Sequence, residues 1–408
     1  MQIFLVGGSV RDELLNLPVN DKDWVVVGAT PQEMLEQGYL KVGKDFPVFL
    51  HPDTKEEYAL ARTERKIGKG YHGFECYSAT DVTIEQDLMR RDLTINAIAK
   101  SEKGDLIDPF NGQTDINNRV LRHVSEAFSE DPVRILRVAR FAARYAHLGF
   151  TIADETLKLM QEMVANGEVD ALVPERVWKE MSSALLEASP EVFFESLRQC
   201  GALAKLFPDL DKLWGIPQPE RYHPEIDTGV HVMMSLKKSV EYSDKLSVRF
   251  AVLCHDLGKG KTPKSKWPSH HGHEGLGVKP ISNWCKQYRV PNDCKDLAVK
   301  VAKWHLHAHK ALELTPKTLL KFLSALDAFR KPELLEDFLL ACMADTRGRK
   351  GLEEQAYPQA DYIREVFQIV QAVDVKALMA KGYEGGALGE QLYRARLQAI
   401  KIFKDQQN

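Results

Sequence analysis

Two aspartates stand one residue apart, just before an apolar run near the N-terminus. The segment reads "VNDKDWVVVG" and contains Asp21 and Asp23. Alternate residues of a strand point to the same side, so the two carboxylates can share a divalent cation with a preference for oxygen ligands. Upstream, "FLVGGSVRD" sets an apolar run before Gly7, Gly8 and Ser9. A strand, a glycine turn and a helix N-terminus expose backbone N–H groups that hold phosphate.

Each of these features alone is common, because double glycines usually mark turns and acidic loops are usually solvated. Their combination predicts a site for phosphoryl transfer from a nucleoside triphosphate, which needs carboxylates for Mg²⁺ and a cradle for the phosphates. Arg11 lies in the first turn of the helix after Ser9 and can reach a phosphate, or form an ordinary surface salt bridge.

Further arginines follow in "DLMRRDLTINAIA", where Arg90, Arg91 and Asp92 interrupt a helical apolar pattern. The forked guanidinium group suits phosphate, and Asp92 could orient an arginine or contact a ribose hydroxyl. A solvated charged face is the alternative interpretation.

The segment "SEDPVRILRVARFAARYAHLGF" predicts a helix with an arginine stripe. At 100° per residue its arginines fall within an arc of about 120°, with the apolar residues mostly facing away. No glutamate of the same helix neutralises them at i±4. The stripe is a candidate surface for a triphosphate and a base, and a basic outer face is the alternative. Asp131, just before Pro132, could simply cap the helix. The arginines of the stripe are Arg134, Arg137, Arg140 and Arg144.

Nine of the 13 histidines lie beyond residue 220. In "RFAVLCHDLGKG", His255 and Asp256 end an apolar helical run, with His231 upstream and Asp345 downstream. Two imidazoles and two carboxylates form a mixed nitrogen and oxygen site for a divalent transition metal, with room for water.

The remaining histidines of this section carry weaker signals. "HHGHEG" and "WHLHAH" could supply outer-sphere or phosphate-contacting imidazoles. We expect His307 and His309 to be surface imidazoles.

Together these segments resemble the class II tRNA nucleotidyltransferases, the CCA-adding enzymes, in their bacterial form with a fused HD phosphohydrolase domain. The resemblance rests on ordered motifs along the whole chain: "LVGGSVRD", "NDKDWVVVG", "KVGKDFPVFLHP", "ARTERK", "RRDLTINAIA", "DPFNG" and "EDPVRILRVARFAAR". It implies an α+β fold: a polymerase-β-like head with a small mixed sheet plus helices, then an all-helical neck and body and an all-helical HD domain. The expected parts are the head (residues 1–112), the helical neck and body (113–220), the HD domain (221–350) and a helical tail (351–408).

In the head, the resemblance assigns catalytic Mg²⁺ to Asp21 and Asp23, and Glu57 is a weaker candidate for a third acid. The Glu-Asp-x-x-Arg motif falls on Glu130, Asp131 and Arg134, which would act as the protein template for the incoming base. The nucleotide, CTP or ATP, would be bound by Gly8, Arg11, Arg91, Asp92, Asp131, Arg134, Arg137 and Arg140.

The template assignment has a simple physical logic. Cytosine presents an amine donor beside the N3 acceptor, and adenine presents an amine beside the N1 acceptor. The carboxylate of Asp131 and the guanidinium of Arg134 match both edges, whereas guanine and uracil present the opposite order. The change from C to A would have to come from the growing RNA end and the shape of the pocket.

In the HD domain, the resemblance implies phosphatase, 2′-nucleotidase and 2′,3′-cyclic phosphodiesterase activity, supported by Ni²⁺ or another divalent transition metal. The metal ligands would be His231, His255, Asp256 and Asp345, with His255 and Asp256 also catalytic. The RNA partner would be the 3′ acceptor end of tRNA, in maturation or repair.

The bulk properties agree with a cytoplasmic multidomain enzyme. The 408 residues predict two to four domains, and short β-rich runs (3–6, 24–27, 48–50, 58–61, 106–107) stop near residue 112. We expect no secretory signal and no membrane span, and six scattered cysteines without a CxxC favour a reducing compartment. A net charge of −3 does not by itself indicate a nucleic-acid partner.

Three rival functions remain. A bacterial poly(A) polymerase shares the head but not the fused HD section, and CTP incorporation distinguishes the two. An HD hydrolase with a decayed head, or a non-enzymatic RNA-binding scaffold, conflicts with the intact motifs around Asp21 and Asp23. Monomer and homo-oligomer are both compatible with the sequence.

Overall fold

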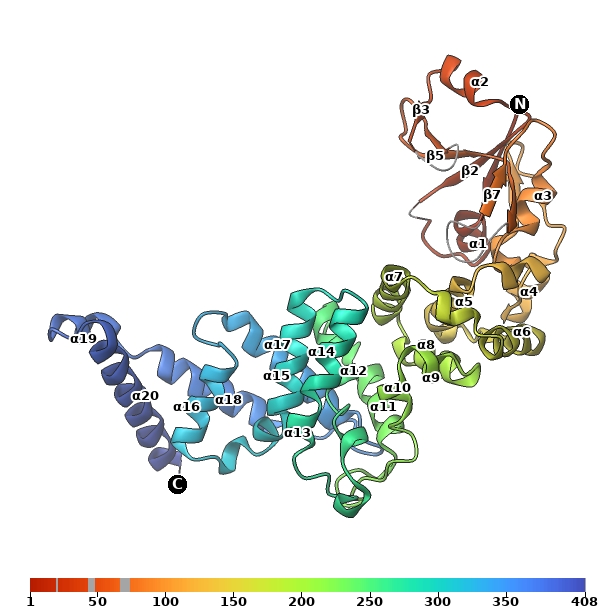
Figure 1. The fold of residues 1–408 in the computed structure, drawn as a ribbon. Coiled ribbons are helices and arrows are strands. Elements are labelled where there is room, and N and C mark those ends of the chain that lie inside the picture. The colour runs from red at the N-terminus through yellow and green to blue at the C-terminus, as the bar shows by residue number, and fades with distance from the viewer. Residues whose placement is uncertain (20, 43–47, 67–73, 408) are drawn as a thin grey trace. The chain divides into compact units, whose positions relative to one another are not determined.

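The computed structural model describes residues 1–19, 21–42, 48–66 and 74–407. Part of the motif "KVGKDFPVFLHP" (residues 43–47) and Asn20 of "NDKDWVVVG" therefore lie outside the described residues. The chain divides into two compact units, Met1–Leu206 and Phe207–Asn408. Strands belong to the first unit and the second is helical, which confirms the expected α+β fold (Figure 1).

The described part of the head contains a mixed sheet with the strand order β3-β4-β5-β2-β1-β8-β9. Strand β1 pairs antiparallel with β2, and β2 pairs parallel with β5. The strands are β1 (Gln2–Val6), β2 (Asp23–Val27), β3 (Leu40–Lys41), β4 (Val48–Leu50), β5 (Glu57–Leu60), β8 (Ala99–Ser101) and β9 (Leu106–Ile107). A separate two-stranded sheet pairs β6 (Thr63–Lys66) antiparallel with β7 (Phe74–Tyr77).

Both faces of this sheet are covered, because successive residues of β2 enter different clusters. Val25 belongs to a buried cluster that includes Leu88 of α3 (Ile84–Met89). Val26 packs on the other side, in a cluster with Met34 of α2 (Pro31–Glu36). Asp23 stands two residues before Val25 in the same strand, so its side chain points to the same face of the sheet, the one that α3 covers.

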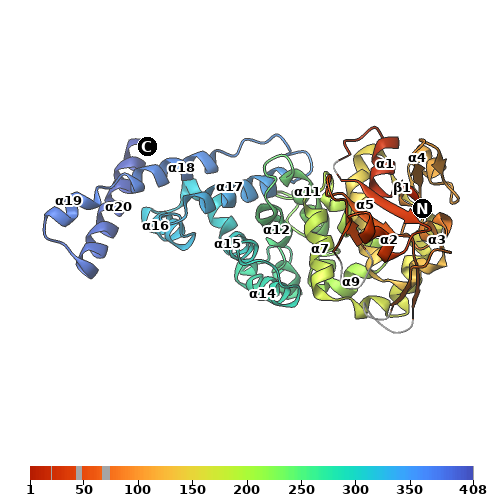
Figure 2. The same ribbon diagram turned by 90° about the horizontal axis from the view of Figure 1, so that it is seen from above.

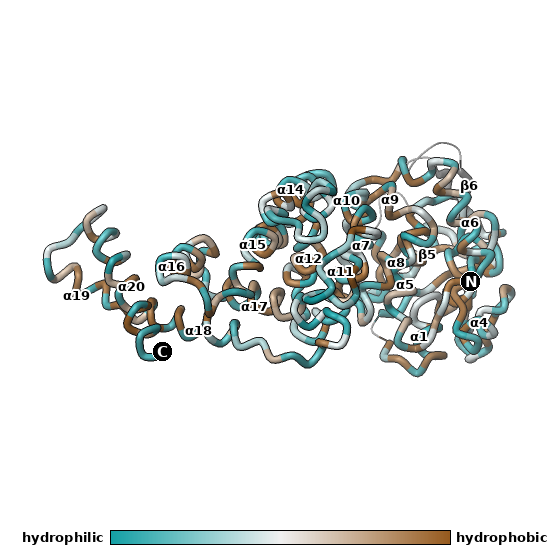
Figure 3. The backbone as a smooth tube through the Cα atoms, turned by 90° about the horizontal axis from the view of Figure 1, so that it is seen from below, coloured by the Kyte–Doolittle hydropathy of each residue, from teal (hydrophilic) through white to brown (hydrophobic). Residues whose placement is uncertain are grey.

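The helices that follow the head pack around α5 (Val133–Tyr145), which α7 (Pro174–Leu185) and α8 (Pro190–Gln199) contact. Pro174 and Pro190 occupy first-turn positions, where the missing N–H costs nothing. The hydropathy colouring alternates along the helices, as amphipathic packing requires (Figure 3). The other elements of this unit include α1 (Gly8–Leu14), α4 (Gly112–Asn118), β10 (Val120–Leu121), β11 (Thr151–Ile152), α6 (Asp154–Ala165) and α9 (Ala202–Leu206).

The second unit is centred on α12 (Leu246–Cys254), a short helix buried along most of its length. It packs against α11 (Thr228–Ser239), α15 (Asn292–His309) and α17 (Pro332–Arg347), which run side by side in Figure 2. The other helices are α10 (Pro208–Asp211), α13 (His273–Leu276), α14 (Val278–Gln287), α16 (Pro316–Ala325), α18 (Pro358–Gln371), α19 (Val375–Ala380) and α20 (Gly385–Gln407).

Directly after α12, the backbone passes very close to α13. A Cβ atom added at Gly258 would lie 1.9 Å from the carbonyl oxygen of His273 and 2.7 Å from the nitrogen of Gly277. A glycine is needed for this approach, which holds His255 and Asp256 against the histidines of the next segment. Among the described helices, none has the length and apolar character to span a bilayer.

Candidate functional sites

The glycine turn between β1 and α1 lies under an arginine. Gly7 has a φ of +68°, and a Cβ atom there would be 2.7 Å from Nη1 of Arg91. A Cβ atom at Gly8 would be 3.3 Å from Nη2 of Arg11. Side chains at this turn would displace both guanidinium groups, so the two glycines allow cations to approach the backbone.

Only one of the two aspartates lies within a strand, because Asp23 is the first residue of β2 and Asp21 precedes the strand. Asp23 opens β2, opposite Val6 of β1, and both Asp21 and Asp23 are exposed. Burial by neighbouring groups raises the pKa of Asp23, with a further rise from Asp21, while Arg91 opposes the shift. Among the described residues, neither carboxylate has a hydrogen-bond or ion-pair partner. Two adjacent, unpaired carboxylates fit a divalent cation with oxygen ligands.

Glu57, the candidate third acid, faces Asp23 across the parallel β2–β5 pair. Register partners of neighbouring strands project from the same face, so a third carboxylate stands beside the pair.

The arginine pair after α3 is held by a carboxylate that sequence reasoning missed. Asp87 is fully buried and accepts from Arg90 Nη2 at 2.7 Å and from Arg91 Nη2 at 3.2 Å. Burial would raise the pKa of Asp87, but the two guanidinium groups outweigh it and lower the pKa. The available signal was the spacing of three and four residues from Asp87 to the arginines. Within the described structure, Nε of Arg91 is buried without a partner, which leaves one N–H for a ligand.

Asp92 connects the glycine turn to the long helix α5. Its Oδ1 accepts from Nδ2 of Asn96 at 2.9 Å, and Asn96 Oδ1 accepts from Nη1 of Arg11 at 2.5 Å. Its Oδ2 accepts from Nε of Arg137 at 2.7 Å. Burial opposes ionisation of Asp92, but Arg137 and the hydrogen bonds lower its pKa below the usual range. Asp92 therefore orients an arginine, one of the two roles expected from the sequence.

Three of the predicted nucleotide-binding arginines gather around one ring. The guanidinium carbons of Arg11, Arg137 and Arg140 lie 5.3, 5.7 and 4.7 Å from the centre of the Phe141 ring. A ring face attracts cations and keeps their donor edges available.

As the sequence indicates, α5 contains no glutamate that could pair with its arginine stripe, but the folded chain supplies carboxylates from elsewhere. Carboxylates arrive from other elements: Glu180 of α7 accepts from Nε of Arg140 at 2.7 Å, and Asp12 lies 3.5 Å from Arg144. Buried guanidinium groups require such partners, and these come from distant parts of the sequence. Arg134 differs from the rest, because it is buried and donates to the carbonyl oxygens of Ala127 (3.0 Å) and Arg90 (2.6 Å).

Asp131 has two contacts that bear on its predicted roles. Its Oδ1 accepts from the backbone N–H of Val133 at 3.1 Å, a cap-like contact in the first turn of α5. Arg176 of α7 forks onto the same carboxylate, at 3.1 and 2.8 Å. Arg176 was missed by sequence reasoning, although Arg176 and Glu180 stand four residues apart on one helix. Both predicted template residues are therefore fixed by protein contacts.

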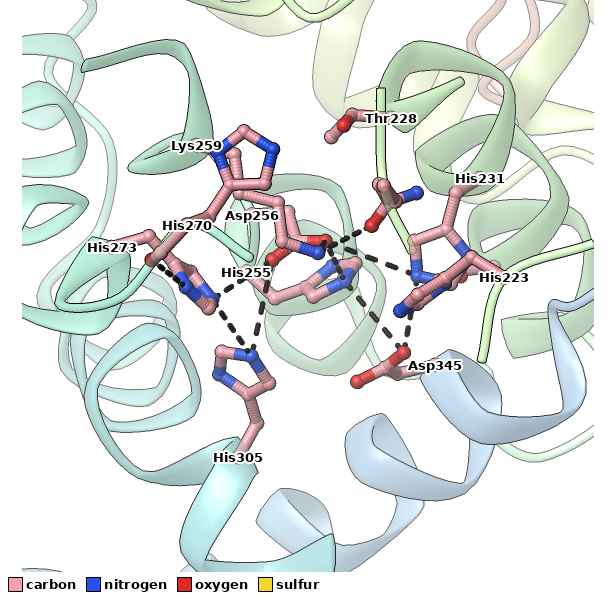
Figure 4. Close-up of polar contacts among 12 residues, drawn as sticks. His223, Thr228, His231, His255, Asp256, Lys259, His270, His273, His305 and Asp345 are labelled. Atoms are coloured by element: carbon pink, nitrogen blue, oxygen red, sulfur yellow. Dashed lines mark hydrogen bonds and ion pairs between the residues drawn. The ribbon is translucent and has the colours of Figure 1, made fainter. Parts of the chain in front are cut away.

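In the second unit, four residues predicted as metal ligands meet at one buried point (Figure 4). Nε2 of His231 lies 3.1 Å from Oδ1 of Asp345 and 3.9 Å from Oδ2 of Asp256. Nε2 of His255 lies 3.2 Å from Oδ2 of Asp256 and 3.8 Å from Oδ1 of Asp345. Helices α11 and α17 and the end of α12 supply these groups.

His273 and His305 form the second half of this centre, on the other oxygen of Asp256. Oδ1 of Asp256 lies 3.3 Å from Nε2 of His273 and 3.9 Å from Nε2 of His305, and the two imidazole nitrogens are 3.4 Å apart. The two oxygens of Asp256 thus face different histidine pairs. One carboxylate between two clusters is suited to two neighbouring metal ions.

The expectation that His309 is a surface imidazole is wrong. Its Nε2 lies 2.7 Å from Oδ2 of Asp345, and its Nδ1 lies 2.9 Å from the hydroxyl of Tyr357. His305 and His309 are four residues apart on α15 and share a face, which is the signal that could have placed both in the site. His307 is half-buried beside Trp304.

The hydrogen bonds on the far side of the rings test whether this centre fits a metal. Nδ1 of His255, His273 and His305 lies 2.7, 3.0 and 3.0 Å from backbone carbonyl oxygens. A carbonyl only accepts, so Nδ1 carries the proton and the lone pair of Nε2 points to the cluster. Among the described residues, Nε2 of His255 and Oδ1 of Asp256 are buried without a hydrogen-bond partner. This donor set fits divalent transition metals.

Charges around the centre favour ligand-ready forms of His305 and Asp256, whereas at His255 burial lowers the pKa but Asp256 and Asp345 outweigh it and raise the pKa. Burial lowers the pKa of His305 well below its usual value, so its imidazole is neutral. Burial would raise the pKa of Asp256, but His255 and Lys259 outweigh it and hold the pKa well below the usual range. Nζ of Lys259 lies 2.6 Å from Oδ2 of Asp256 and also donates to Gln218.

One ligand is held by a carboxylate outside the cluster. Oε1 of Glu225 lies 2.9 Å from Nδ1 of His231 and 3.1 Å from Nδ1 of His223, and the side chain is almost fully buried. A carboxylate behind a ligating imidazole fixes its tautomer and orientation. Sequence reasoning passed over Glu225, whose isolated "HPEID" context carries no metal-ligand spacing.

Three family models match the chain. One described as "Poly A polymerase head domain" covers residues 3–122, one described as "Probable RNA and SrmB- binding site of polymerase A" covers 149–213, and one described as "HD domain" covers 228–331. Multifunctional CCA proteins from Thioalkalivibrio sulfidiphilus (strain HL-EbGR7) and Teredinibacter turnerae (strain ATCC 39867 / T7901) are 61% and 59% identical, over 99% and 100% of this chain and 99% of each relative. This chain belongs to the family of multifunctional CCA proteins.

Solved structures share the fold at lower identity. A CCA-adding enzyme in complex with CTP matches with a TM-score of 0.64 at 20% identity, covering 97% of this chain and 86% of that chain. The Thermotoga maritima CCA-adding enzyme complexed with tRNA matches with a TM-score of 0.60 at 21% identity, with coverages of 97% and 86%. The head and HD domains of this family imply divalent metals, in line with the two carboxylate-containing centres of this chain.

The pairing of Asp92 predicts a pH-dependent contribution to stability. Its folded pKa lies below that of an unfolded aspartate, so the stabilisation is present above about pH 4 and is lost as the pH falls towards the folded pKa. Asp92→Asn should lower the free energy of unfolding of the first unit by about 2 kcal/mol at neutral pH, with a difference that shrinks on acidification. Urea unfolding at several pH values, followed by hydrogen exchange of α5 peptides, measures this difference in the free energy of unfolding. An exposed control, Asp53→Asn, should show no such difference, and a pH-independent loss in Asp92→Asn would contradict the account.

The contact between Glu225 and His231 predicts an effect on metal affinity. Glu225→Gln keeps the shape of the side chain but removes the charge behind the imidazole, so the affinity of the HD centre for Co²⁺ should fall about tenfold or more. The visible absorption of Co²⁺ bound by imidazole reports the affinity. Exposed Glu220→Gln is the matched control. Equal Co²⁺ affinity in Glu225→Gln and the parent chain would exclude the positioning role.

Proposed function

We propose that this protein adds C, C and A to the 3′ end of tRNA from CTP and ATP, without a nucleic-acid template and in one Mg²⁺-dependent site. We also propose that its HD domain is a metal-dependent phosphohydrolase that acts on 2′,3′-cyclic phosphates, 2′-nucleotides and phosphate monoesters. The family name of the relatives and the CTP and ATP complexes of structurally similar CCA-adding enzymes support the first activity.

One observation in the head carries the nucleotidyl transfer. The carboxylate of Asp23 leaves the sheet on the α3 face, Asp21 stands two residues before it, and neither has a partner among the described residues. Arg91 covers the glycine turn beside β2. Mg²⁺ held by these carboxylates would polarise the α-phosphate and activate the RNA 3′ hydroxyl. Gly8 and Arg11 would contact the triphosphate, together with Arg91 through its unused N–H.

The arginines around Phe141 would bind the rest of the nucleotide. Asp92 holds Arg137, and Glu180 holds Arg140, each through one side of the guanidinium group. Fixed cations cost little reorganisation when a polyanion binds, so these carboxylates act as positioning groups. Asp92 could contact a ribose only by accepting a hydrogen bond from its hydroxyl while also accepting one from Arg137.

Base selection would use Asp131 and Arg134 as the template pair. In the structure Arg176 forks onto Asp131, and Arg134 donates to two carbonyl oxygens. The incoming base would therefore replace Arg176 at one carboxylate oxygen, while Arg134 would give up a carbonyl contact. Asp131 and Arg134 would therefore leave their protein partners only for a base that forms hydrogen bonds with both side chains.

In the HD domain, a cluster of four buried imidazoles, the half-buried imidazole of His309 and two carboxylates carries the proposed hydrolysis. Metal ions bound there would lower the pKa of a coordinated water, which supplies the nucleophile. Ni²⁺ fits the imidazole-rich donor set better than Mg²⁺, which prefers oxygen ligands. Asp256 lies between the two halves, and Lys259 beside it could bind a substrate phosphate.

We propose the division into a head (1–112), a helical neck and body (113–220), an HD domain (221–350) and a helical tail (351–408). The family-model matches at 3–122 and 228–331 support the first and third parts.

The proposed transfer is tested with tRNA that lacks its 3′ CCA, supplied with one labelled nucleotide at a time. CTP alone should extend the RNA by two residues, and ATP should be added only afterwards, with GTP and UTP excluded. A chain that ignores CTP and forms adenylate runs would instead be a poly(A) polymerase, the rival that shares the head.

The template pair predicts a change in selectivity rather than in rate alone. Asp131→Ala or Arg134→Ala should raise incorporation of UTP and GTP relative to CTP and ATP by about tenfold or more, because one mismatched hydrogen-bond pair is no longer penalised. Single-nucleotide kinetics with all four substrates measure the ratios. Lys179→Ala, at an exposed position of α7 away from the template pair, is the control and should preserve discrimination. If Asp131→Ala loses stability but keeps all four ratios, Asp131 is only a helix cap.

A further inference from the structure

The segment between α12 and α13 is a lysine-rich loop that starts at the HD centre. We name residues 257–272, "LGKGKTPKSKWPSHHG", the basic loop; it contains four lysines and no acidic residue. Its first lysine, Lys259, touches Asp256 of the metal cluster at 2.6 Å. The basic loop therefore starts in direct contact with the site where phosphate would be hydrolysed.

The basic loop is held in one shape by side chains buried beneath it. His270 is 1% exposed, with Nδ1 at 2.6 Å from Oγ1 of Thr262 and Nε2 at 2.8 Å from the carbonyl oxygen of Pro217. Thr262 donates in turn to the carbonyl oxygen of Lys259 at 2.8 Å. Figure 4 shows His270 beside Lys259 and the metal cluster. A series of lysines that is merely solvated would not require these buried hydrogen bonds of His270 and Thr262.

Its exposed end keeps two lysines without acidic partners. Lys261 is paired with Asp209 at 2.6 Å, and Lys259 is committed to Asp256. Lys264 and Lys266 are exposed, and among the described residues no carboxylate pairs with either. Lys266 donates to the carbonyl oxygen of His271 at 3.2 Å, which fixes its position.

An aromatic side chain lies between these lysines and the anchor. Nζ of Lys264 is 5.9 Å from the centre of the Trp267 ring. Nε1 of Trp267 is buried and has no hydrogen-bond partner in the described structure. Lysines alternating with an aromatic ring form the usual surface for single-stranded nucleic acid, where phosphates meet cations and a base meets the ring.

We propose that the basic loop binds the single-stranded 3′-terminal segment of RNA and delivers its terminal phosphate to the HD centre. The proposal rests on the proposed phosphohydrolase function and specifies its substrate as an RNA end rather than a free nucleotide. Lys264 and Lys266 would contact backbone phosphates upstream of the terminal nucleotide, and Lys259 lies beside the reacting phosphate. A mononucleotide has no upstream backbone phosphates and therefore lacks these contacts.

The test compares two substrates in the full-length, metal-loaded chain: a short single-stranded RNA ending in a 2′,3′-cyclic phosphate, and 2′,3′-cyclic AMP. Lys264→Glu combined with Lys266→Glu should raise KM for the RNA about tenfold or more and leave kcat unchanged. KM for cyclic AMP should stay within about twofold. Removing two phosphate contacts should also reduce the slope of log KM against log salt by about 1.4. Lys376→Glu with Lys381→Glu, exposed lysines at and just after α19, is the matched control and should change neither substrate.

Crosslinking separates failure of this proposal from failure of the hydrolase assignment. RNA with 4-thiouridine next to its 3′ end should crosslink to peptides of the basic loop in the parent chain and not in the lysine variant. If the parent hydrolyses neither substrate but forms these crosslinks, the hydrolase assignment fails and the RNA surface stands. Absent crosslinks with unchanged KM for RNA would overturn the RNA surface. An equal rise of KM for RNA and cyclic AMP would overturn it as well, because the lysines would then act on the reacting phosphate itself.

Discussion

Buried carboxylates require a compensating positive partner, and the two units meet that requirement in different ways. In the head, Asp87 and Asp92 are almost completely buried, and arginines lie against both of them. Each contact uses one part of a guanidinium group and fixes the direction of the rest. Arg11 of α1 and Arg137 and Arg140 of α5 thus lie around Phe141 with fixed partners before any ligand arrives.

In the second unit, Asp256 and Asp345 are buried to a similar extent as the two head aspartates. Their partners are mostly imidazoles rather than arginines. Backbone carbonyl oxygens hold the outer nitrogen of three rings, so the inner nitrogen presents a lone pair rather than a proton. Carboxylates facing lone pairs repel one another unless a cation lies between them. The same constraint thus gathers arginines around buried carboxylates in the head and imidazoles around buried carboxylates in the second unit.

Local patterns predicted much of this arrangement. Short runs of β-forming residues placed β1, β2, β4, β5 and β9 within a residue of their observed bounds. Of the two aspartates expected on one strand, Asp23 opens β2 and Asp21 lies before it. The pairing of charges could not be predicted, because Asp12 and Arg144, or Asp131 and Arg176, are far apart in sequence and meet only through tertiary packing. His309 was misjudged because the buried face of α15 depends on where α17 lies. A spacing of four from His305 was the only local sign.

The account holds that the two centres are chemically independent, one an oxygen-ligand Mg²⁺ site and the other an imidazole-rich site. The most direct measurement assays both activities on two folded variants, Asp21→Asn with Asp23→Asn, and His255→Asn with Asp256→Asn. The first variant should lose nucleotide addition by several orders of magnitude and hydrolyse 2′,3′-cyclic AMP at the parent rate. The second should lose hydrolysis and still complete CCA on truncated tRNA, with Ni²⁺ raising hydrolysis only in the first. If either folded variant loses both activities together, the two centres do not act independently and the account is wrong.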